Sequence, residues 1–294
     1  MNEYVIATAS TCDLSSVYLY GHNVPFISYT YEIDGEVFQD DCRSETKRNL
    51  IAAMREGKMP NTSQITEYAY YEFFKGILEE GNDLIYTDMS RAVSSSIANA
   101  ERAIAKVKEE YPDRKIHFID SYCITGGLAL FIKQLVQCRN RSMTFEETVE
   151  WGEAHKREFI HRFMVDDLQW LRKGGRLSNA SAIVGSLLSI KPLLYIKNDG
   201  KLVAIDKIRG RKKCLKALID SMKDDIADIT YEEEMYIIHT DQKEEAEQLR
   251  TDLCNHWPGL KEENISIMRI GPVIGAHVGP GFMAIAYHGK NRIM

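Results

Sequence analysis

Serine and threonine side chains gather in three short segments, each lying just before an expected helix. The segments are residues 60–64 (PNTSQ), 90–96 (SRAVSSS) and 120–127 (DSYCITGG). Hydroxyl groups and unpaired backbone N–H groups at the start of a helix can bind an anion. Each segment taken alone is also explained as a helix cap, because serine and threonine are preferred there. The candidate ligand contacts in these segments are Thr62, Ser63, Ser94, Ser95 and Ser121.

The second and third of these segments follow expected strands, at residues 83–88 and 115–120. In an open α/β sheet, ligands bind beyond the carboxyl ends of the strands. The three hydroxyl-rich segments together therefore point to one shared cleft, and this convergence is more informative than any one segment.

Two glycine-containing segments carry further candidates. In residues 173–178 (KGGRLS), Arg176 could reach a carboxylate or phosphate, although a helix C-cap with a solvated arginine explains it as well. In residues 271–281 (GPVIGAHVGPG), His277 lies among four glycines and two prolines. A turn between two strands would explain this composition, but such a directed backbone favours a functional histidine.

A basic stretch stands out against a chain of net charge −6 and pI near 5.8. The acidic balance argues against nucleic acid as the main partner. The basic stretch predicts either a solvated face or a docking surface for an acidic partner. Its members are Lys201, Lys207, Arg209, Arg211, Lys212, Lys213 and Lys216.

Several classes of protein are disfavoured by what the sequence lacks. No apolar run approaches the roughly 20 residues of a membrane span, and the N-terminus lacks a signal-peptide pattern, so we expect a cytoplasmic protein. Six scattered cysteines predict free thiols and no zinc site. The motifs GxGxxG, GxxxxGK[ST], HExxH and GxSxG are absent, which disfavours nucleotide enzymes and simple hydrolases. We expect neither a metal nor a cofactor.

The first half of the chain alternates expected strands and helices, which predicts a parallel α/β sheet. Residues 144–147 (TFEE) have the pattern of a capping box, and we expect the helix that they start to run to about residue 162. The expected strands are residues 4–8, 83–88 and 115–120, with an edge strand at 24–29, and the expected helices are 45–55, 66–81, 95–109 and 126–137.

The second half predicts an α+β layer with antiparallel pairs. Asp199-Gly200 between two apolar runs, residues 190–196 and 202–208, indicates a hairpin. We therefore predict an N-terminal α/β domain over residues 1–162 and a C-terminal α+β domain over 163–294, with a ligand in the cleft between them. The other expected elements are helices at 211–222 and 243–256 and strands at 235–239, 265–270 and 282–287.

In combination, these motifs resemble the DegV family of bacterial fatty-acid-binding proteins over essentially the whole chain. The order and spacing of many pieces make the match specific. The chain departs from the family pattern at Ala9, where the family often has Asp, and at residues 90–96, where both family glycines are replaced. The matching pieces are residues 10–14 (STCDL), 62–64 (TSQ), 120–121 (DS), 126–127 (GG), 171–177 (LRKGGRL), 190–192 (IKP), 209–210 (RG) and 277–281 (HVGPG).

The resemblance implies that one long-chain fatty acid lies between the two domains. It implies that Thr62, Ser94 and the loop of His277 hold the carboxylate, with Gly279 in that loop and Arg176 near the head group. Some members deliver the acid to a separate kinase that makes an acyl phosphate. The region around Arg209, Arg211 and Lys212 resembles the surface used for that docking.

We therefore expect a lipid-binding carrier that is not an enzyme, with the fatty acid as its ligand and a fatty acid kinase as its partner. Burial of about 15 methylenes would supply on the order of 12 kcal/mol before the costs of association. Two alternatives stay open. One is an acyl hydrolase or transferase that uses Ser94 and His277, and the other is a carrier of a different amphipathic lipid.

Overall fold

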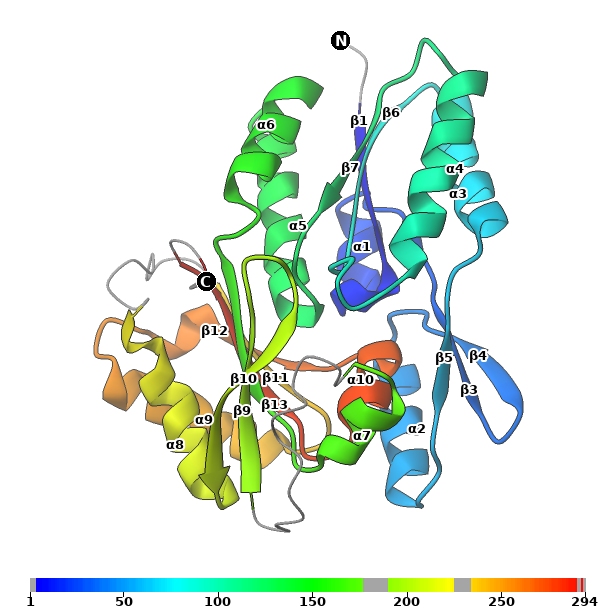
Figure 1. Ribbon diagram of the computed structural model, residues 1–294. Helices are drawn as coiled ribbons and strands as arrows, with labels where there is room; N and C mark the ends of the chain where they lie inside the picture. The colour runs from blue at the N-terminus through cyan, green and yellow to red at the C-terminus, as the bar shows by residue number, and fades with distance from the viewer. Residues whose placement is uncertain (1–3, 177–189, 225–233, 290–291, 293–294) are drawn as a thin grey trace.

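The N-terminal half builds a parallel sheet of four strands in the order β2-β1-β6-β7. The computed structural model describes residues 4–176, 190–224, 234–289 and 292. Strands β1 and β6 are buried along their whole length because helices cover both faces of the sheet, α5 and α6 one and α3 and α4 the other (Figure 1). The elements are β1 (Tyr4–Ala9), β2 (Phe26–Ile27), β6 (Asp83–Asp88), β7 (Ile116–Asp120), η1 (Ser10–Cys12), α1 (Ser16–Gly21), α3 (Glu67–Glu79), α4 (Ser96–Glu110), α5 (Thr125–Asn140) and α6 (Phe145–His155).

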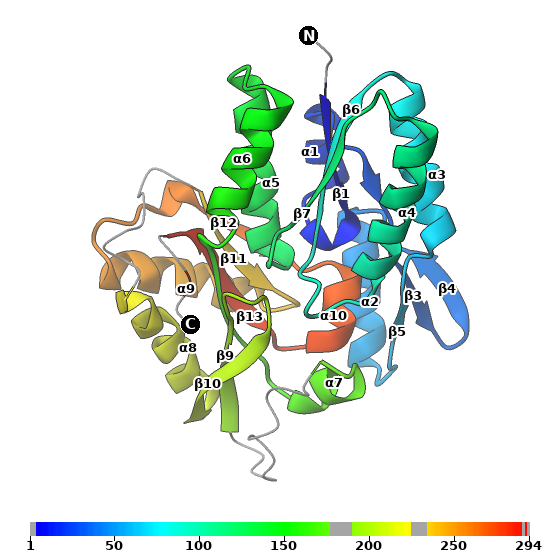
Figure 2. The same ribbon diagram turned by 45° about the horizontal axis from the view of Figure 1, so that its top comes forward.

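A small antiparallel sheet, ordered β4-β3-β5, extends from the N-terminal half beside helix α2. Both views place it next to α10, and α10 packs against α2, β3 and β5 (Figures 1 and 2). The sequence predicted the helix here but none of the three strands. The elements are β3 (Thr30–Ile33), β4 (Glu36–Gln39), α2 (Ser44–Arg55) and β5 (Asn61–Ser63).

The second half forms a six-stranded sheet in the order β10-β9-β8-β13-β11-β12. Its pairs are antiparallel except β11 with β12, and the predicted hairpin around Gly200 joins β9 to β10. Helices α8 and α9 cover one face and α5 packs on the other (Figure 1). The elements are β8 (Phe159–Met164), α7 (Leu168–Lys173), β9 (Ile190–Ile196), β10 (Leu202–Arg209), α8 (Arg211–Asp220), η3 (Ser221–Asp224), β11 (Met235–His239), α9 (Lys243–His256), η5 (Glu262–Asn264), β12 (Ile265–Arg269), α10 (Pro272–Val278) and β13 (Met283–His288). The two-domain α/β and α+β architecture is thus confirmed.

One predicted element was wrong, and one Gly-rich segment contains a helix. The capping box at Thr144 is present, but its helix α6 ends at His155, and residues 159–164 form β8. That segment pairs with β13 and β9 and is buried along its whole length, His161 and Arg162 included, and a short buried strand cannot be told from a helix by periodicity. The Gly-rich segment 271–281, for which a turn between two strands was the alternative explanation, contains helix α10, whose proline stands in the first turn. The boundary predicted after residue 162 lies inside β8, and where the domains divide stays a prediction.

Two glycines at the start of α5 let the helix lie against the second sheet. A Cβ on Gly127 would stand 1.9 Å from Cε1 of His161, and one on Gly126 would stand 2.7 Å from Cδ1 of Ile238. Burial lowers the pKa of His161 to about 3, so the ring is neutral and Nε2 accepts a hydrogen bond from the Gly127 N–H at 2.9 Å. The Gly-Gly pair of the sequence therefore joins the two halves of the molecule.

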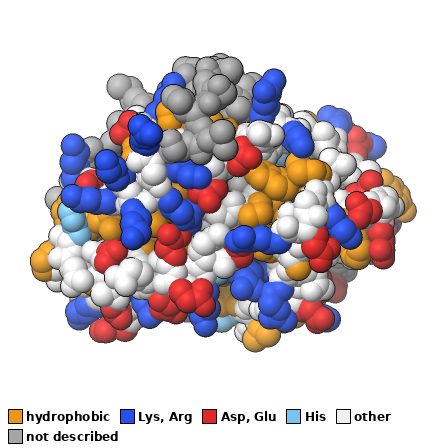
Figure 3. All heavy atoms as spheres, turned by 90° about the horizontal axis from the view of Figure 1, so that it is seen from below, with side chains coloured by type: hydrophobic (Ala, Val, Ile, Leu, Met, Phe, Trp, Pro, Cys, Tyr) orange, Lys and Arg blue, Asp and Glu red, His pale blue; other side chains and the backbone are white. Residues whose placement is uncertain are grey.

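The surface seen from below carries Lys and Arg side chains interspersed with Asp and Glu, and hydrophobic side chains gather near its middle (Figure 3). Across the part of the chain that the structure describes, no helix combines the length and the apolar character needed to span a membrane.

Candidate functional site

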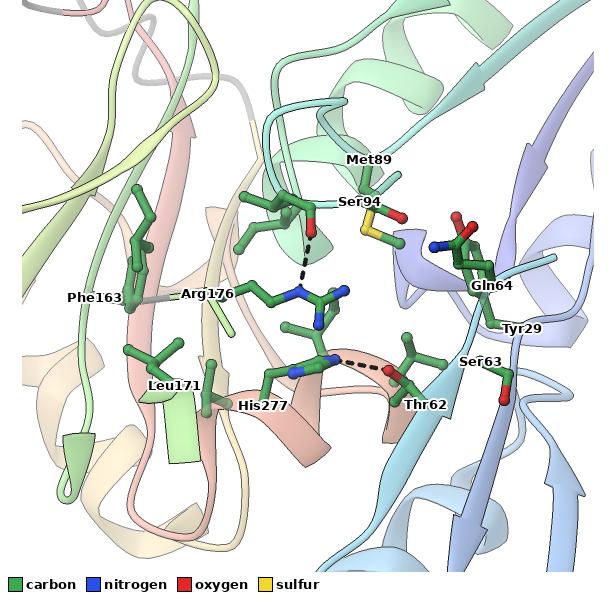
Figure 4. Close-up of a pocket in the computed structure, with 16 residues that line it drawn as sticks. Tyr29, Thr62, Ser63, Gln64, Met89, Ser94, Phe163, Leu171, Arg176 and His277 are labelled. Carbon is green, nitrogen blue, oxygen red and sulfur yellow. Dashed lines mark hydrogen bonds between the residues drawn. The ribbon is translucent and has the colours of Figure 1, made fainter. Parts of the chain in front are cut away.

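An apolar cavity lies where the two halves meet, between β5, the segment before α4, α7 and α10. The space free of protein atoms in and around it is about 680 Å³, and this volume includes open solvent. Most of its wall is hydrophobic, and Thr62 and Ser94 lie beside Arg176 and His277, with Tyr29, Ser63 and Gln64 to one side (Figure 4). The apolar lining consists of Met89, Val93, Ile124, Phe163, Leu171, Leu202, Val273, Ile274 and Val278, and the polar lining of Tyr29, Thr62, Ser63, Gln64, Ser94, Arg176 and His277.

At the polar end, Thr62 and His277 are hydrogen-bonded, with Oγ1 and Nε2 2.8 Å apart. Burial and then the charge of Arg176 lower the pKa of His277 to about 4, so the ring is neutral at pH 7. When the proton is on Nε2, His277 donates to Thr62, and the threonine hydroxyl is free to donate to a ligand. Figure 4 shows His277 and Arg176 pointing into the same space, with Thr62 and Ser94 at its edges.

Arg176 brings a positive charge into this cavity. Its Nε donates to the carbonyl of Val93 at 3.2 Å, and its Nη1 donates to the carbonyl of Gly174. The side chain is partly buried, and no carboxylate in the described ranges forms an ion pair with it. Since a charge in an apolar setting is costly unless it is paired, the site is suited to a ligand that carries one negative group.

Helices α7 and α10 approach closely at two glycines. A Cβ on Gly174 would lie 2.1 Å from Nδ1 of His277, and one on Gly279 would lie 2.2 Å from Cδ1 of Trp170. Gly279 also has a φ of +77°, which favours glycine. These two positions fix the place of His277 relative to the residues before Arg176.

Five of the predicted ligand contacts line the cavity, and three do not. Thr62, Ser63, Ser94, Arg176 and His277 come together there. Outside the lining, Ser95 accepts a hydrogen bond from Gln64 at 2.6 Å, Ser121 donates to the carbonyl of Asp88 at 2.7 Å, and Gly279 packs on Trp170. Contact between a ligand and any of these eight residues stays a prediction. The cavity lining does not support it for Ser95, Ser121 and Gly279.

Most of the cavity wall was missed by the sequence analysis. Gln64 directly follows the predicted Thr62-Ser63 pair, and that adjacency was the one available signal. Tyr29 and the apolar lining come from strands, helices and connecting segments far apart in the chain, so no spacing in the sequence groups them.

The three predicted docking residues differ in their surroundings. Arg209 and Lys212 are exposed. Arg211 is instead bound within the fold, where it pairs with Asp166 at 2.8 Å, with Glu245 and with the carbonyl of Gly281. On the side of α8 and α9, the surface seen in Figure 3 mixes basic and acidic side chains. Arg211 therefore ties α8 to its neighbours, and docking through Arg209 and Lys212 stays a prediction.

Among the residues described by the structure, no group of three or more His, Cys, Asp or Glu side chains could hold a metal ion. The five cysteines Cys12, Cys42, Cys123, Cys138 and Cys214 are buried, Cys254 is half-buried, and all six are free thiols, as predicted.

The fold and the site define a two-domain α/β protein with an apolar ligand cavity that is polar at one end. The family model of DegV proteins matches residues 3–290, and the chain belongs to the DegV family. Two relatives are 36% and 32% identical, the first a DegV domain-containing protein of Streptococcus pyogenes serotype M3 and the second one of Clostridium perfringens. The alignments cover 98% and 99% of this chain and 99% of each relative.

Solved structures share the fold. The fatty acid binding DegV family protein SAG1342 of Streptococcus agalactiae is 27% identical, with a TM-score of 0.86 over 99% of this chain and all of that one. The Fatty Acid Kinase B3 protein of Streptococcus pneumoniae, loaded with linoleic acid, is 23% identical, with a TM-score of 0.81 over 97% of this chain and 99% of that one. The second likeness concerns the fold alone.

Proposed function

We propose that this protein binds one long-chain fatty acid, with the hydrocarbon chain along the apolar walls and the carboxylate at the polar end. The observation that carries this proposal is the position of Arg176, a cation without an acidic partner among the described residues at one end of a largely hydrophobic cavity. Fatty acid binding by the related Streptococcus agalactiae protein supports it.

The polar end offers donors of several kinds to a carboxylate. The guanidinium of Arg176 supplies charge, and the hydroxyls of Thr62 and Ser94 supply hydrogen bonds. Each buried methylene contributes about 0.8 kcal/mol, so the tail supplies most of the affinity. The head-group residues determine which end of the ligand enters, because a carboxylate against the apolar wall would be left unpaired.

We further propose that the protein is a carrier that presents the carboxylate to a separate fatty acid kinase for conversion to an acyl phosphate. This step rests on the resemblance of the chain to family members that work in this way. The alternative of an acyl hydrolase needs Ser94 and His277 as a nucleophile and base pair. His277 Nε2 is engaged by Thr62, and the Ser94 hydroxyl accepts a hydrogen bond from the Ser96 N–H at 3.3 Å.

Mass spectrometry of the bound ligand tests the carrier proposal. The protein, purified from a bacterial host without detergent, is expected to release one fatty acid per chain on denaturation and solvent extraction. Thr62→Ala combined with Ser94→Ala is expected to release much less, because the carboxylate loses both hydroxyl donors. Ser95→Ala, a neighbouring serine outside the cavity lining, should keep the ligand.

An empty wild-type extract, together with no uptake of added fatty acid, would rule the proposal out. Turnover of acyl esters by the purified protein alone would favour the hydrolase. A different lipid in the extract would favour the alternative that the protein carries another amphipathic lipid.

Charge reversal at the exposed basic residues tests the kinase partner. Arg209→Glu combined with Lys212→Glu is expected to lower phosphorylation of the bound fatty acid by a bacterial fatty acid kinase at least tenfold. Fatty acid binding should be unchanged, since neither residue lines the cavity. Lys108→Glu, an exposed change on α4 of the other domain, is the matched control. Equal phosphorylation rates for both proteins would contradict this docking surface.

A further inference from the structure

Three charged residues are buried together at the start of α10, away from the cavity lining. Asp13 follows η1, Asp40 follows β4, and Lys47 lies in α2, and they are exposed by only 2%, 1% and 6%. Both carboxylate oxygens of Asp13 and Oδ2 of Asp40 make no hydrogen bond of ordinary geometry within the described structure. Buried carboxylates are normally paired, so this cluster calls for a physical explanation.

The two carboxylates converge on the first residue of the α10 cap. A Cβ on Gly271 would lie 2.2 Å from Oδ1 of Asp13 and 3.4 Å from Oδ2 of Asp40. The glycine thus allows two carboxylates from different segments to approach the same backbone atom. Any side chain at 271 would force either the Asp13 carboxylate or α10 to move.

Lys47 completes the contact between the two halves. Its ammonium donates to the backbone carbonyl of Asp13 at 2.8 Å and to that of Arg269, just before α10, at 3.3 Å. One ammonium facing two carboxylates leaves an excess negative charge, which a proton shared by the carboxylates would remove. The other titratable groups facing the cluster are the buried thiols of Cys12 and Cys42.

The raised pKa values of the two carboxyl groups agree with a proton shared between them. Burial, and then the charge of Asp13, raise the pKa of Asp40 to about 7, while Lys47 opposes the rise. Burial also raises the pKa of Asp13, while the charge of Lys47, the hydroxyl of Thr125 and the backbone N–H of Gly271 oppose that rise. A carboxyl whose pKa is raised in the folded protein favours its protonated form there, so the arrangement weakens as the pH rises towards and through 7.

The cluster touches two walls of the cavity. Helix α10 begins at the cluster and carries Val273, Ile274 and His277, which line the cavity. The N–H of Asp40 donates to the carbonyl of Tyr29 at 2.9 Å, and Tyr29 lines the cavity from the other half. A displacement at the cluster would therefore move the polar end of the cavity.

We infer that Asp13, Asp40 and Lys47 are positioning residues. The two carboxyls share a proton, and with Lys47 they hold α10, and with it His277, in place for an anionic ligand. This inference rests on the proposed function, because its readout is fatty acid affinity. It gives a role to Asp13, which belongs to the family-like segment 10–14 but does not line the cavity. When both Asp13 and Asp40 are ionised, two negative charges face the one ammonium of Lys47. Because the carboxylates then repel each other, α10 shifts.

The affinity for a fluorescent conjugated C18 polyene fatty acid, measured between pH 6 and pH 8.5, tests the inference. Wild-type affinity is expected to fall roughly tenfold across this range, as one proton is lost. Asp40→Asn mimics the protonated carboxyl and should show no such fall. Lys47→Met removes the compensating charge and should move the midpoint of the fall to higher pH. Because the pKa of His277 is about 4, that ring does not titrate in this range.

Urea unfolding at the same pH values gives a readout that needs no ligand. Wild-type stability should decline from pH 5 to pH 8, and the stability of Asp40→Asn should decline less. Identical pH profiles of affinity for the wild type and Asp40→Asn would overturn the inference. Absence of binding at every pH would instead overturn the proposed function, and the positioning role with it.

Discussion

Gly174→Ala is expected to lower fatty acid affinity at least tenfold while leaving the protein folded. The added methyl group would lie 2.1 Å from Nδ1 of His277, so the ring must leave its place beside Thr62. The φ of Gly174 is −70°, which alanine adopts without strain, and the clash with His277 is therefore the main effect of the change. Titration with a fluorescent fatty acid measures the loss, and circular dichroism checks the fold.

Gly175→Ala is the matched control for this change. Gly175 has a φ of +71°, and no atom lies within 4 Å of a Cβ placed there. Alanine at this position costs about 1 kcal/mol of backbone strain but leaves His277 untouched. Equal loss of affinity in the two variants would show that the backbone of the segment, and not the position of His277, controls binding.

Asp88→Ala is expected to lower the free energy of unfolding by about 3–5 kcal/mol. Asp88 ends β6, is fully buried and accepts five hydrogen bonds, which come from the backbone N–H of Met89 and the hydroxyls of Thr11, Tyr29, Tyr70 and Tyr86. Burial raises the pKa of the carboxyl, and the hydroxyl donors oppose that rise. Removal of the acceptor leaves several buried donors unsatisfied.

Urea unfolding of Asp88→Ala and of Thr87→Val provides the comparison. The hydroxyl of the neighbouring Thr87 is also buried on β6, but it makes a single hydrogen bond, to the carbonyl of Ile119 at 2.9 Å. We expect Thr87→Val to cost about 1–2 kcal/mol. If Asp88→Ala cost no more than that, the five donors would have other partners in the variant. Because Tyr29 also lines the cavity, Asp88→Ala should weaken ligand binding as well.

Local patterns in the sequence determined much of the architecture. The capping box at Thr144, the hairpin at Asp199-Gly200 and the buried strands β1, β6 and β7 each depend on contacts within about ten residues or on a simple run of apolar side chains. Such features leave a direct trace in residue type and spacing. The hydroxyl-rich and glycine-containing segments supplied the candidates at the polar end of the cavity, and the resemblance to the DegV family gave them a common ligand.

The arrangement of these strands and helices around the cavity could be seen only in the three-dimensional structure. Residues 159–164 became a strand because β13 and β9 flank them on both sides, and His277 gained its place because α10 packs between α7 and α2. The polar end of the cavity joins Thr62 to His277, and Lys47 of the cluster is hydrogen-bonded to the carbonyl of Arg269, so each joins segments more than 200 residues apart. Packing between distant segments depends on shape and on burial, and neither leaves a spacing pattern in the chain. The sequence thus showed which side chains are able to bind an anion. The packing of distant segments determines which of these side chains line the same cavity.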